Sequence, residues 1–145
     1  TKKKKMGYLK ANNLRIGNIV ASSGNPSNIK TWVIGKVISI SSLDTDFEQI
    51  EVETDEEFTW FFKDNYFGVP LSIEKLLSFG FKELRDGIYQ FWSKDVGIFQ
   101  VMICSDNNGF GIRIWTTGTL GRTIHYVNDF QNLFYSLTGV ELEMS

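Results

Sequence analysis

Two neighbouring β-strands are predicted by residues 47–62, which read FEQIEVETDEEFTWFF. From Phe47 to Glu53, apolar and polar side chains alternate, so Ile50 and Val52 face a core while Glu51 and Glu53 face solvent. Residues 58–62, of which four are aromatic and one is threonine, predict the next strand. This alternation has the period of a half-buried strand, so we expect the surrounding region to be β structure.

The residues before this stretch predict a long central strand. Residues 31–40 alternate with largely apolar side chains on both faces, which is typical of a strand with little solvent on either side. Residues 22–28 have the serine, glycine, asparagine and proline content of a loop. The opening motif Arg15-x-Gly17-x-x-Val20, two long strands and short turns make this half resemble a small SH3-like barrel.

The second half of the chain predicts a short helix followed by hairpins. A helix is expected at residues 72–79, with Ser72 as its N-cap and Gly80 at its end. Asp86-Gly87 predicts the turn of one hairpin, and residues 106–110 predict the turn of a second. Residues 123–127 predict a further short strand.

The last helix is expected at residues 129–138, with Asn128 as its N-cap and Gly139 closing it. Four apolar side chains have the spacing of one buried helical face: Phe130, Leu133, Phe134 and Leu137. Residues 140–143 suggest a terminal strand. The predicted fold class is therefore α+β, a mainly antiparallel sheet with an SH3-like N-terminal half and two short helices packed on it.

Composition limits the chemistry more than it limits the fold. The chain has 145 residues, enough for one domain or two very small ones, and its 42% hydrophobic and 22% charged residues are ordinary for a soluble globular protein. Cys104 and His125 are the only residues of their types, which excludes an internal disulfide framework and a Cys/His zinc site built from one chain. They also leave little for nucleophilic or acid–base catalysis. We therefore expect no enzyme activity, catalytic residue, metal or cofactor.

The net charge of −2 hides two opposite clusters. Lys2 to Lys5 form a basic run, interpreted as part of a flexible tail at residues 1–10, with an arm for nucleic acid as the alternative. Residues 11–145 are expected to form a single globular domain. No apolar stretch follows the lysines as in a signal peptide, and none is long enough to cross a bilayer. A cytoplasmic protein without a membrane partner is expected.

The acidic cluster at residues 44–57 holds eight of the 17 acidic residues. Alternate acids on a strand lie roughly 6.6–6.8 Å apart, so such a row can present negative charge at a nucleic-acid-like interval. The alternative interpretation is a solvated strand face that discourages edge aggregation. The aromatic residues that follow indicate either burial or a partner site. The candidate partner-binding residues are Glu48, Glu51, Glu53, Asp55, Glu57, Trp60, Phe62 and Tyr66.

Residues 128–142, NDFQNLFYSLTGVEL, are similar to a C-terminal signature of small proteins encoded by bacterial prophages and mobile elements. In that family the pattern is roughly Leu-Gln-Asn-Leu-Tyr followed by Leu-Thr-Gly-Glu-Glu-Leu. Residues 14–20, LRIGNIV, and residues 69–81, VPLSIEKLLSFGF, match further pieces in the same order. The resemblance implies a phage or mobile-element setting and no particular activity.

These observations together predict a non-catalytic accessory protein that binds a macromolecule. Its most concrete form is an inhibitor of a host defence complex, in the manner of anti-CRISPR proteins, which presents an acidic, nucleic-acid-like surface. The expected partner is a protein, such as a defence nuclease or a ribonucleoprotein complex. The alternative is a small module that binds nucleic acid directly through its SH3-like half and basic arm.

Overall fold

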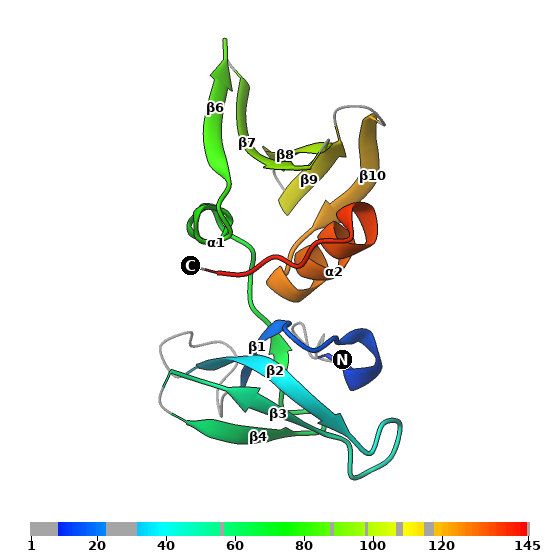
Figure 1. The fold of residues 1–145 in the computed structure, drawn as a ribbon. Coiled ribbons are helices and arrows are strands. Elements are labelled where there is room, and N and C mark those ends of the chain that lie inside the picture. Colours follow the sequence, from blue (N-terminus) through cyan, green and yellow to red (C-terminus); the bar gives the residue numbers. More distant parts are fainter. Residues whose placement is uncertain are drawn as a thin grey trace, which may run out of the picture. The chain divides into compact units, whose positions relative to one another are not determined.

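The computed structural model describes residues 9–22, 32–55, 57–87, 89–97, 99–106, 109–114 and 118–144. The chain divides into two compact units, Thr1–Val69 and Pro70–Ser145, and each contains one five-stranded antiparallel sheet (Figure 1). The predicted α+β class, mainly antiparallel β with two helices, is confirmed. The lysine run at residues 2–5 lies outside the described residues. One globular domain over residues 11–145 stays a prediction, because each unit is described by itself.

The first unit contains a sheet with the strand order β4-β3-β2-β1-β5. Its elements are the 3₁₀ helix η1 (Ala11–Asn13), β1 (Ile19–Ser22), β2 (Val33–Ser41), β3 (Gln49–Glu53), β4 (Phe58–Phe62) and β5 (Phe67–Gly68). Strands β2, β3 and β4 follow one another as antiparallel neighbours, whereas β1 pairs with both β2 and β5. This order leaves β4 at one edge of the sheet (Figure 1).

One face of this sheet forms the core of the first unit. Ile50 and Val52 are fully buried, as their alternation predicts, and Phe61 of β4 joins them. The other members of this core are Ala11, Leu14, Val20, Val37 and Tyr66. Strand β2 is central in the order, but Val33 and Ile34 are exposed. The expectation of little solvent on both of its faces is therefore wrong at its first residues.

Gly35 of β2 packs closely against the neighbouring strand. A Cβ atom built on it would lie 2.9 Å from the backbone oxygen of Glu53 and 3.1 Å from the Cβ of Val52. We expect Gly35→Ala to lower the free energy of unfolding by about 2 kcal/mol, because the backbones must move apart. Gly111→Ala is the matched control, since nothing lies within 4 Å of its Cβ. Urea denaturation of both variants measures the difference, and equal stabilities would contradict the close packing.

The second unit contains a meander with the order β10-β9-β8-β7-β6. Its elements are α1 (Ile73–Ser78), β6 (Lys82–Asp86), β7 (Tyr89–Val96), β8 (Phe99–Asp106), β9 (Gly109–Ile114), β10 (Gly118–Ile124) and α2 (Val127–Thr138). Both predicted hairpins are present. Gly97 has a φ of 59° and lies in the turn between β7 and β8.

The helix ends follow local chemistry. The Ser72 hydroxyl accepts a hydrogen bond from the Lys75 N–H at 3.3 Å, which confirms the predicted N-cap of α1. Gly139 caps α2 in the left-handed conformation, also as predicted. The N-cap of α2 is Tyr126, however, and Asn128 is buried within the first turn. Asn128 was therefore wrong as the cap.

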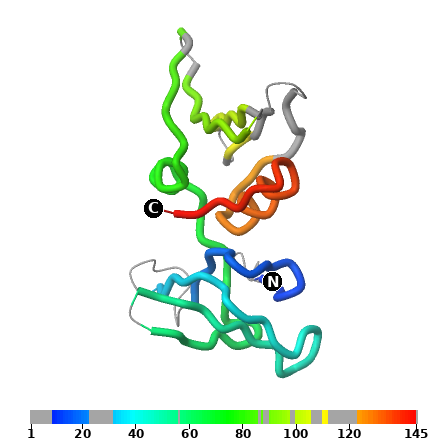
Figure 2. The backbone as a smooth tube through the Cα atoms, viewed as in Figure 1, coloured from blue at the N-terminus to red at the C-terminus, as the bar shows by residue number. Residues whose placement is uncertain are grey.

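Two further features concern the rest of the second unit. Residues 140–144 follow α2 as an irregular segment, so the terminal strand expected there is not formed (Figure 2). Leu142 of this segment is nevertheless buried.

In the described parts of the chain, no helix combines the length and apolar character needed to cross a membrane.

Candidate partner-binding surface

The outer face of β3 and β4 brings acidic and aromatic residues together. In the register of this strand pair, Glu51 lies opposite Trp60 and Glu53 lies opposite Phe58. Gln49 lies opposite Phe62 in the same way. Directly opposed residues project to the same side of a sheet, so these six side chains form one surface. We call the surface made by Glu51, Glu53, Phe58, Trp60 and Phe62 the acid–aromatic face.

Solvent reaches the aromatic residues of this face. Phe58 is 63% exposed, Trp60 38% and Phe62 59%. Exposing large aromatic side chains to water costs free energy. Several such side chains side by side mark a binding surface more often than a single exposed side chain does. The intervening Phe61 points to the core and is 5% exposed. The candidate residues Trp60 and Phe62 therefore share a solvent-facing surface.

The acidic row is shorter on the strand than the sequence suggests. Strand β3 ends at Glu53, and Glu51 and Glu53 are its two outward-facing acids. Asp55 and Glu57 lie beyond its end, both exposed. There the Thr54 N–H donates to the Glu57 carbonyl at 2.8 Å. The four acids therefore do not continue one evenly spaced strand row, although all four lie around the same hairpin.

The salt bridges around strands β3 and β4 are exposed and weak. The Lys36 Nζ lies 4.0 Å from the Glu53 carboxylate, and the Lys63 Nζ lies 3.7 Å from the Asp46 carboxylate. Both pairs have at least one partner that is about half exposed or more. Exposed pairs of this kind contribute roughly 0–1 kcal/mol and are screened by salt. A lysine or arginine of a partner can therefore replace Lys36 beside the Glu53 carboxylate.

Glu48 and Tyr66, two of the candidate residues, meet inside the first unit. Both are buried, at 5% and 0% exposed. The Tyr66 hydroxyl donates a hydrogen bond to the Glu48 carboxylate. The backbone N–H groups of Ala11 and Asp44 also donate to it, each at 3.4 Å. These two residues therefore hold three segments of the unit together, and their side chains lie below the surface.

The environment of this pair shifts both pKa values. Burial by itself raises the pKa of Glu48, but the hydrogen bonds from Tyr66, Ala11 and Asp44, together with the charge of Lys63, lower it on balance. Burial raises the pKa of Tyr66, and the hydrogen bond to the neighbouring carboxylate raises it further. The pair is therefore a neutral phenol bound to an ionised carboxylate at neutral pH.

Phe58 is the member of the acid–aromatic face that the candidate set from the sequence lacks. The signal for it is parity, since Phe58, Trp60 and Phe62 are alternate residues of one strand and must share a face. The same parity places Glu48 with Ile50 and Val52 on the inner face. Its burial could therefore have been predicted from the pattern of residues 47–53.

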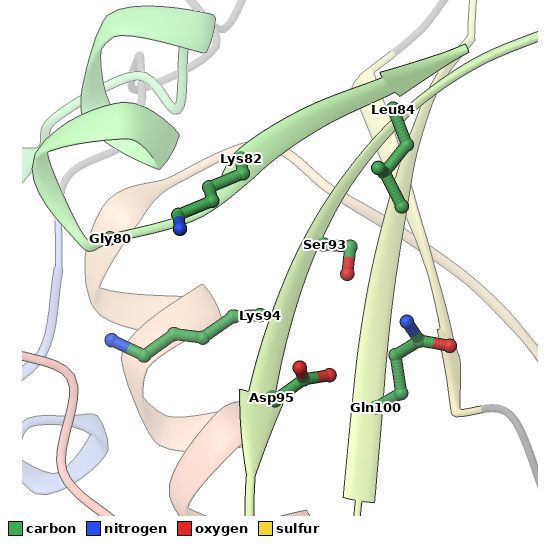
Figure 3. Close-up of a pocket in the computed structure, with 7 residues that line it drawn as sticks. All are labelled: Gly80, Lys82, Leu84, Ser93, Lys94, Asp95 and Gln100. Carbon is green, nitrogen blue, oxygen red and sulfur yellow. The ribbon is translucent and has the colours of Figure 1, made fainter.

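A shallow pocket of about 420 Å³ lies on the second unit between β6, β7 and β8 (Figure 3). Its lining residues are Gly80, Lys82, Leu84, Ser93, Lys94, Asp95 and Gln100. The Lys94 Nζ points away from Ser93 and donates to the carbonyl of Phe79 at 2.6 Å, so its charge is used at the end of α1 (Figure 3). The lining includes no histidine or cysteine that could act with the Ser93 hydroxyl.

The groups that could carry other chemistry are placed apart from this pocket. His125 is exposed just before α2, with its ring 6.3 Å from that of Tyr126. Cys104 lies partly buried in β8. Among the residues that the structure describes, no group of three or more His, Cys, Asp or Glu residues could hold a metal ion.

Comparison of the chain with models of protein families, with curated proteins and with solved structures found no match.

Proposed function

We propose that this chain is a non-catalytic binding protein that attaches to a basic protein surface through its acid–aromatic face. The observation that carries the proposal is the register of β3 and β4, which places Glu51 and Glu53 directly beside Trp60 and Phe58. Tryptophan is among the residue types that contribute most to binding energy in protein interfaces, and aromatic residues in general are enriched there. The negative charge selects partners rich in lysine and arginine and speeds their association.

The sequence resemblance to prophage and mobile-element proteins supports a more specific form of this proposal. A defence nuclease or ribonucleoprotein complex in the host cytoplasm has a basic channel for nucleic acid, and an acidic protein surface can occupy such a channel. The chain would then act as an inhibitor in the manner of anti-CRISPR proteins. The SH3-like character of the first half belongs to this proposal, and the pairing of β1 with both β2 and β5 supports it.

The test is affinity capture of partners from the bacterial host by the wild type and by the double variant Glu51→Lys, Glu53→Lys. We expect the variant to lose capture by at least about tenfold, because each reversal replaces attraction with repulsion. The control is Glu74→Lys, Glu143→Lys, which changes the net charge equally at exposed acids of the second unit. Circular dichroism establishes that both variants fold.

Two outcomes would count against this function. Capture of the same partner by the face variant and by the control would show that the acid–aromatic face is not the interface. Salt-sensitive binding of RNA or DNA by the purified wild type at low ionic strength would favour the nucleic-acid-binding alternative.

A further inference from the structure

The backbone of β4 offers hydrogen-bonding groups along its outer edge. In the described part of the sheet, β4 pairs with β3 alone. At the two ends of this pairing, the Thr54 N–H donates to the Glu57 carbonyl at 2.8 Å, and the Lys63 N–H donates to the Glu48 carbonyl at 3.0 Å. Hydrogen-bonded and non-hydrogen-bonded residue pairs alternate along an antiparallel ladder. The backbone groups of Thr59 and Phe61 therefore point to β3.

It follows that the remaining residues of β4 direct their backbone N–H and C=O groups to the free edge. These residues are Phe58, Trp60 and Phe62. They are the same residues whose side chains form the aromatic part of the acid–aromatic face. They also form the non-hydrogen-bonded pairs with β3, in which opposed side chains approach most closely. The edge thus combines backbone donors and acceptors, exposed rings and carboxylates along one line.

We propose that β4 accepts an extended segment of the partner as an additional antiparallel strand, with lysine or arginine at alternate positions over the acid–aromatic face. This inference rests on the proposed function and adds the mode of recognition. Strand addition supplies affinity through backbone hydrogen bonds and specificity through alternate side chains. Residues of the added strand opposite Phe58, Trp60 and Phe62 project to the same side as those rings.

The chemistry of the face selects cations at those positions. A guanidinium or ammonium group of the added strand beside Trp60 or Phe58 can lie over an aromatic ring. A cation–π contact at that point adds to the binding free energy. Glu51 and Glu53 lie on the far side of the same rings and add charge attraction. Arginine suits this arrangement best, because its planar group stacks on rings and bonds carboxylates at the same time.

A basic segment fits this edge better than a second copy of the chain does. Pairing of β4 with the β4 of another copy would bring two acidic faces into one continuous sheet. Asp46, Asp55 and Glu57 are exposed near the ends of the same hairpin and would add to the repulsion. Charged residues of this kind discourage self-association of edge strands while leaving them open to an oppositely charged partner.

The test uses a synthetic peptide of alternating threonine and arginine in two N-methylated forms, with binding followed by calorimetry. One form carries N-methyl groups on the arginines, and the other carries the same number on the threonines. In the proposed register the arginine N–H groups bond to β4, whereas the threonine N–H groups point away. We expect methylation of the arginines to weaken binding by at least about tenfold, and methylation of the threonines to change it little.

A second arm examines the side chains with the unmethylated peptide. Trp60→Ala is expected to weaken binding on the order of tenfold. Glu51→Lys, Glu53→Lys is expected to lose the arginine peptide and to bind a peptide of alternating threonine and glutamate instead. Recovery by the exchanged charge shows that the variant is folded and that the register is retained. Failure to bind either peptide, with native circular dichroism, would overturn the proposal.

The outcomes separate this inference from the proposed function. If the face variant loses its cellular partner but both methylated peptides bind equally, strand addition is wrong and the binding surface stands. If the changes at the acid–aromatic face alter neither the capture of the cellular partner nor the binding of the peptide, both proposals are wrong. A dimer in sedimentation velocity that excludes the peptide would also overturn the inference, because a second copy would then hold the edge.

Discussion

Replacing Phe130 by alanine is expected to lower the free energy of unfolding of the protein by about 4 kcal/mol. The Phe130 side chain is fully buried and lies at the centre of an aromatic cluster. Its ring centroid is 6.1 Å from that of Phe79, 5.6 Å from that of Phe81 and 6.3 Å from that of Phe134. Truncation removes contacts with the end of α1, the start of β6 and α2 together, so little of the cavity can close by collapse.

The measurement is denaturation in urea, combined with hydrogen exchange of the backbone amides in α2. Phe62→Ala is the matched control, since the same atoms are deleted from a side chain that is 59% exposed. The control is expected to cost less than about 1 kcal/mol. Phe130→Leu should fall between the two. Equal losses in the Phe130 and Phe62 variants would contradict the central place of Phe130 in the core.

The alternation at residues 49–53 is the part of the fold that the sequence predicts best. Ile50 and Val52 are buried because successive side chains of a strand point to opposite faces. A strand that borders a single core therefore turns every second side chain toward that core. Local patterns were less reliable where tertiary contacts compete with them. The helix α2 begins after Tyr126 rather than after Asn128. The β-bridge from Pro70 and the bond from the Leu71 N–H to the His125 carbonyl hold the chain extended up to that point, so the start of α2 coincides with the end of these tertiary contacts.

Some residues of the candidate surface could be predicted from the sequence, but the geometry of that surface could not. Acids and aromatics could be selected from composition, but their juxtaposition depends on the register of β3 and β4, which the hydrogen bonds between Thr54 and Glu57 fix at one end. Asp55 and Glu57 continue the alternation of acids in the sequence, and only the pairing partners reveal that the strand ends at Glu53. Glu48 shows the converse error. An acidic residue was assigned to the surface by type, although its parity placed it inside.

Glu48→Gln is expected to lower the free energy of unfolding by about 2–3 kcal/mol at neutral pH. All three hydrogen-bond partners of the carboxylate are donors: the Tyr66 hydroxyl and the N–H groups of Ala11 and Asp44. A glutamine amide has one acceptor oxygen and one donor nitrogen. Its nitrogen would therefore face donors, and at least one buried group would lose its partner. The isosteric change makes this a test of charge and hydrogen bonding without a cavity.

The loss should depend on pH in a definite direction. The pKa of Glu48 in the folded protein lies below the ordinary value of 4.5. A carboxyl whose pKa is lowered by folding stabilises the protein fully above its unfolded pKa, and this contribution disappears as the pH falls through the folded pKa. The wild type should therefore lose stability on acidification below about pH 4.5 more steeply than Glu48→Gln does. Urea midpoints at several pH values should bring the two proteins closer together in acid.

Two controls isolate the carboxylate. Glu57→Gln makes the same chemical change at an exposed residue and should leave the urea midpoint within about 0.5 kcal/mol of the wild type. Tyr66→Phe removes one donor and keeps the charge, so we expect a smaller loss of about 1–2 kcal/mol and a remaining acid dependence. Parallel pH profiles for the wild type and Glu48→Gln would contradict an ionised Glu48 in the folded protein.

The same pair also connects stability to binding. Glu48 lies immediately before β3, and Tyr66 lies four residues after the end of β4, so their hydrogen bond holds both ends of the hairpin that carries the acid–aromatic face. If recognition uses the edge of β4, Glu48→Gln should weaken peptide binding only as far as it loosens this hairpin. The binding loss should then shrink in conditions that stabilise the fold, such as added sucrose. A binding loss that persists in a fully folded variant would assign Glu48 a direct contact with the partner.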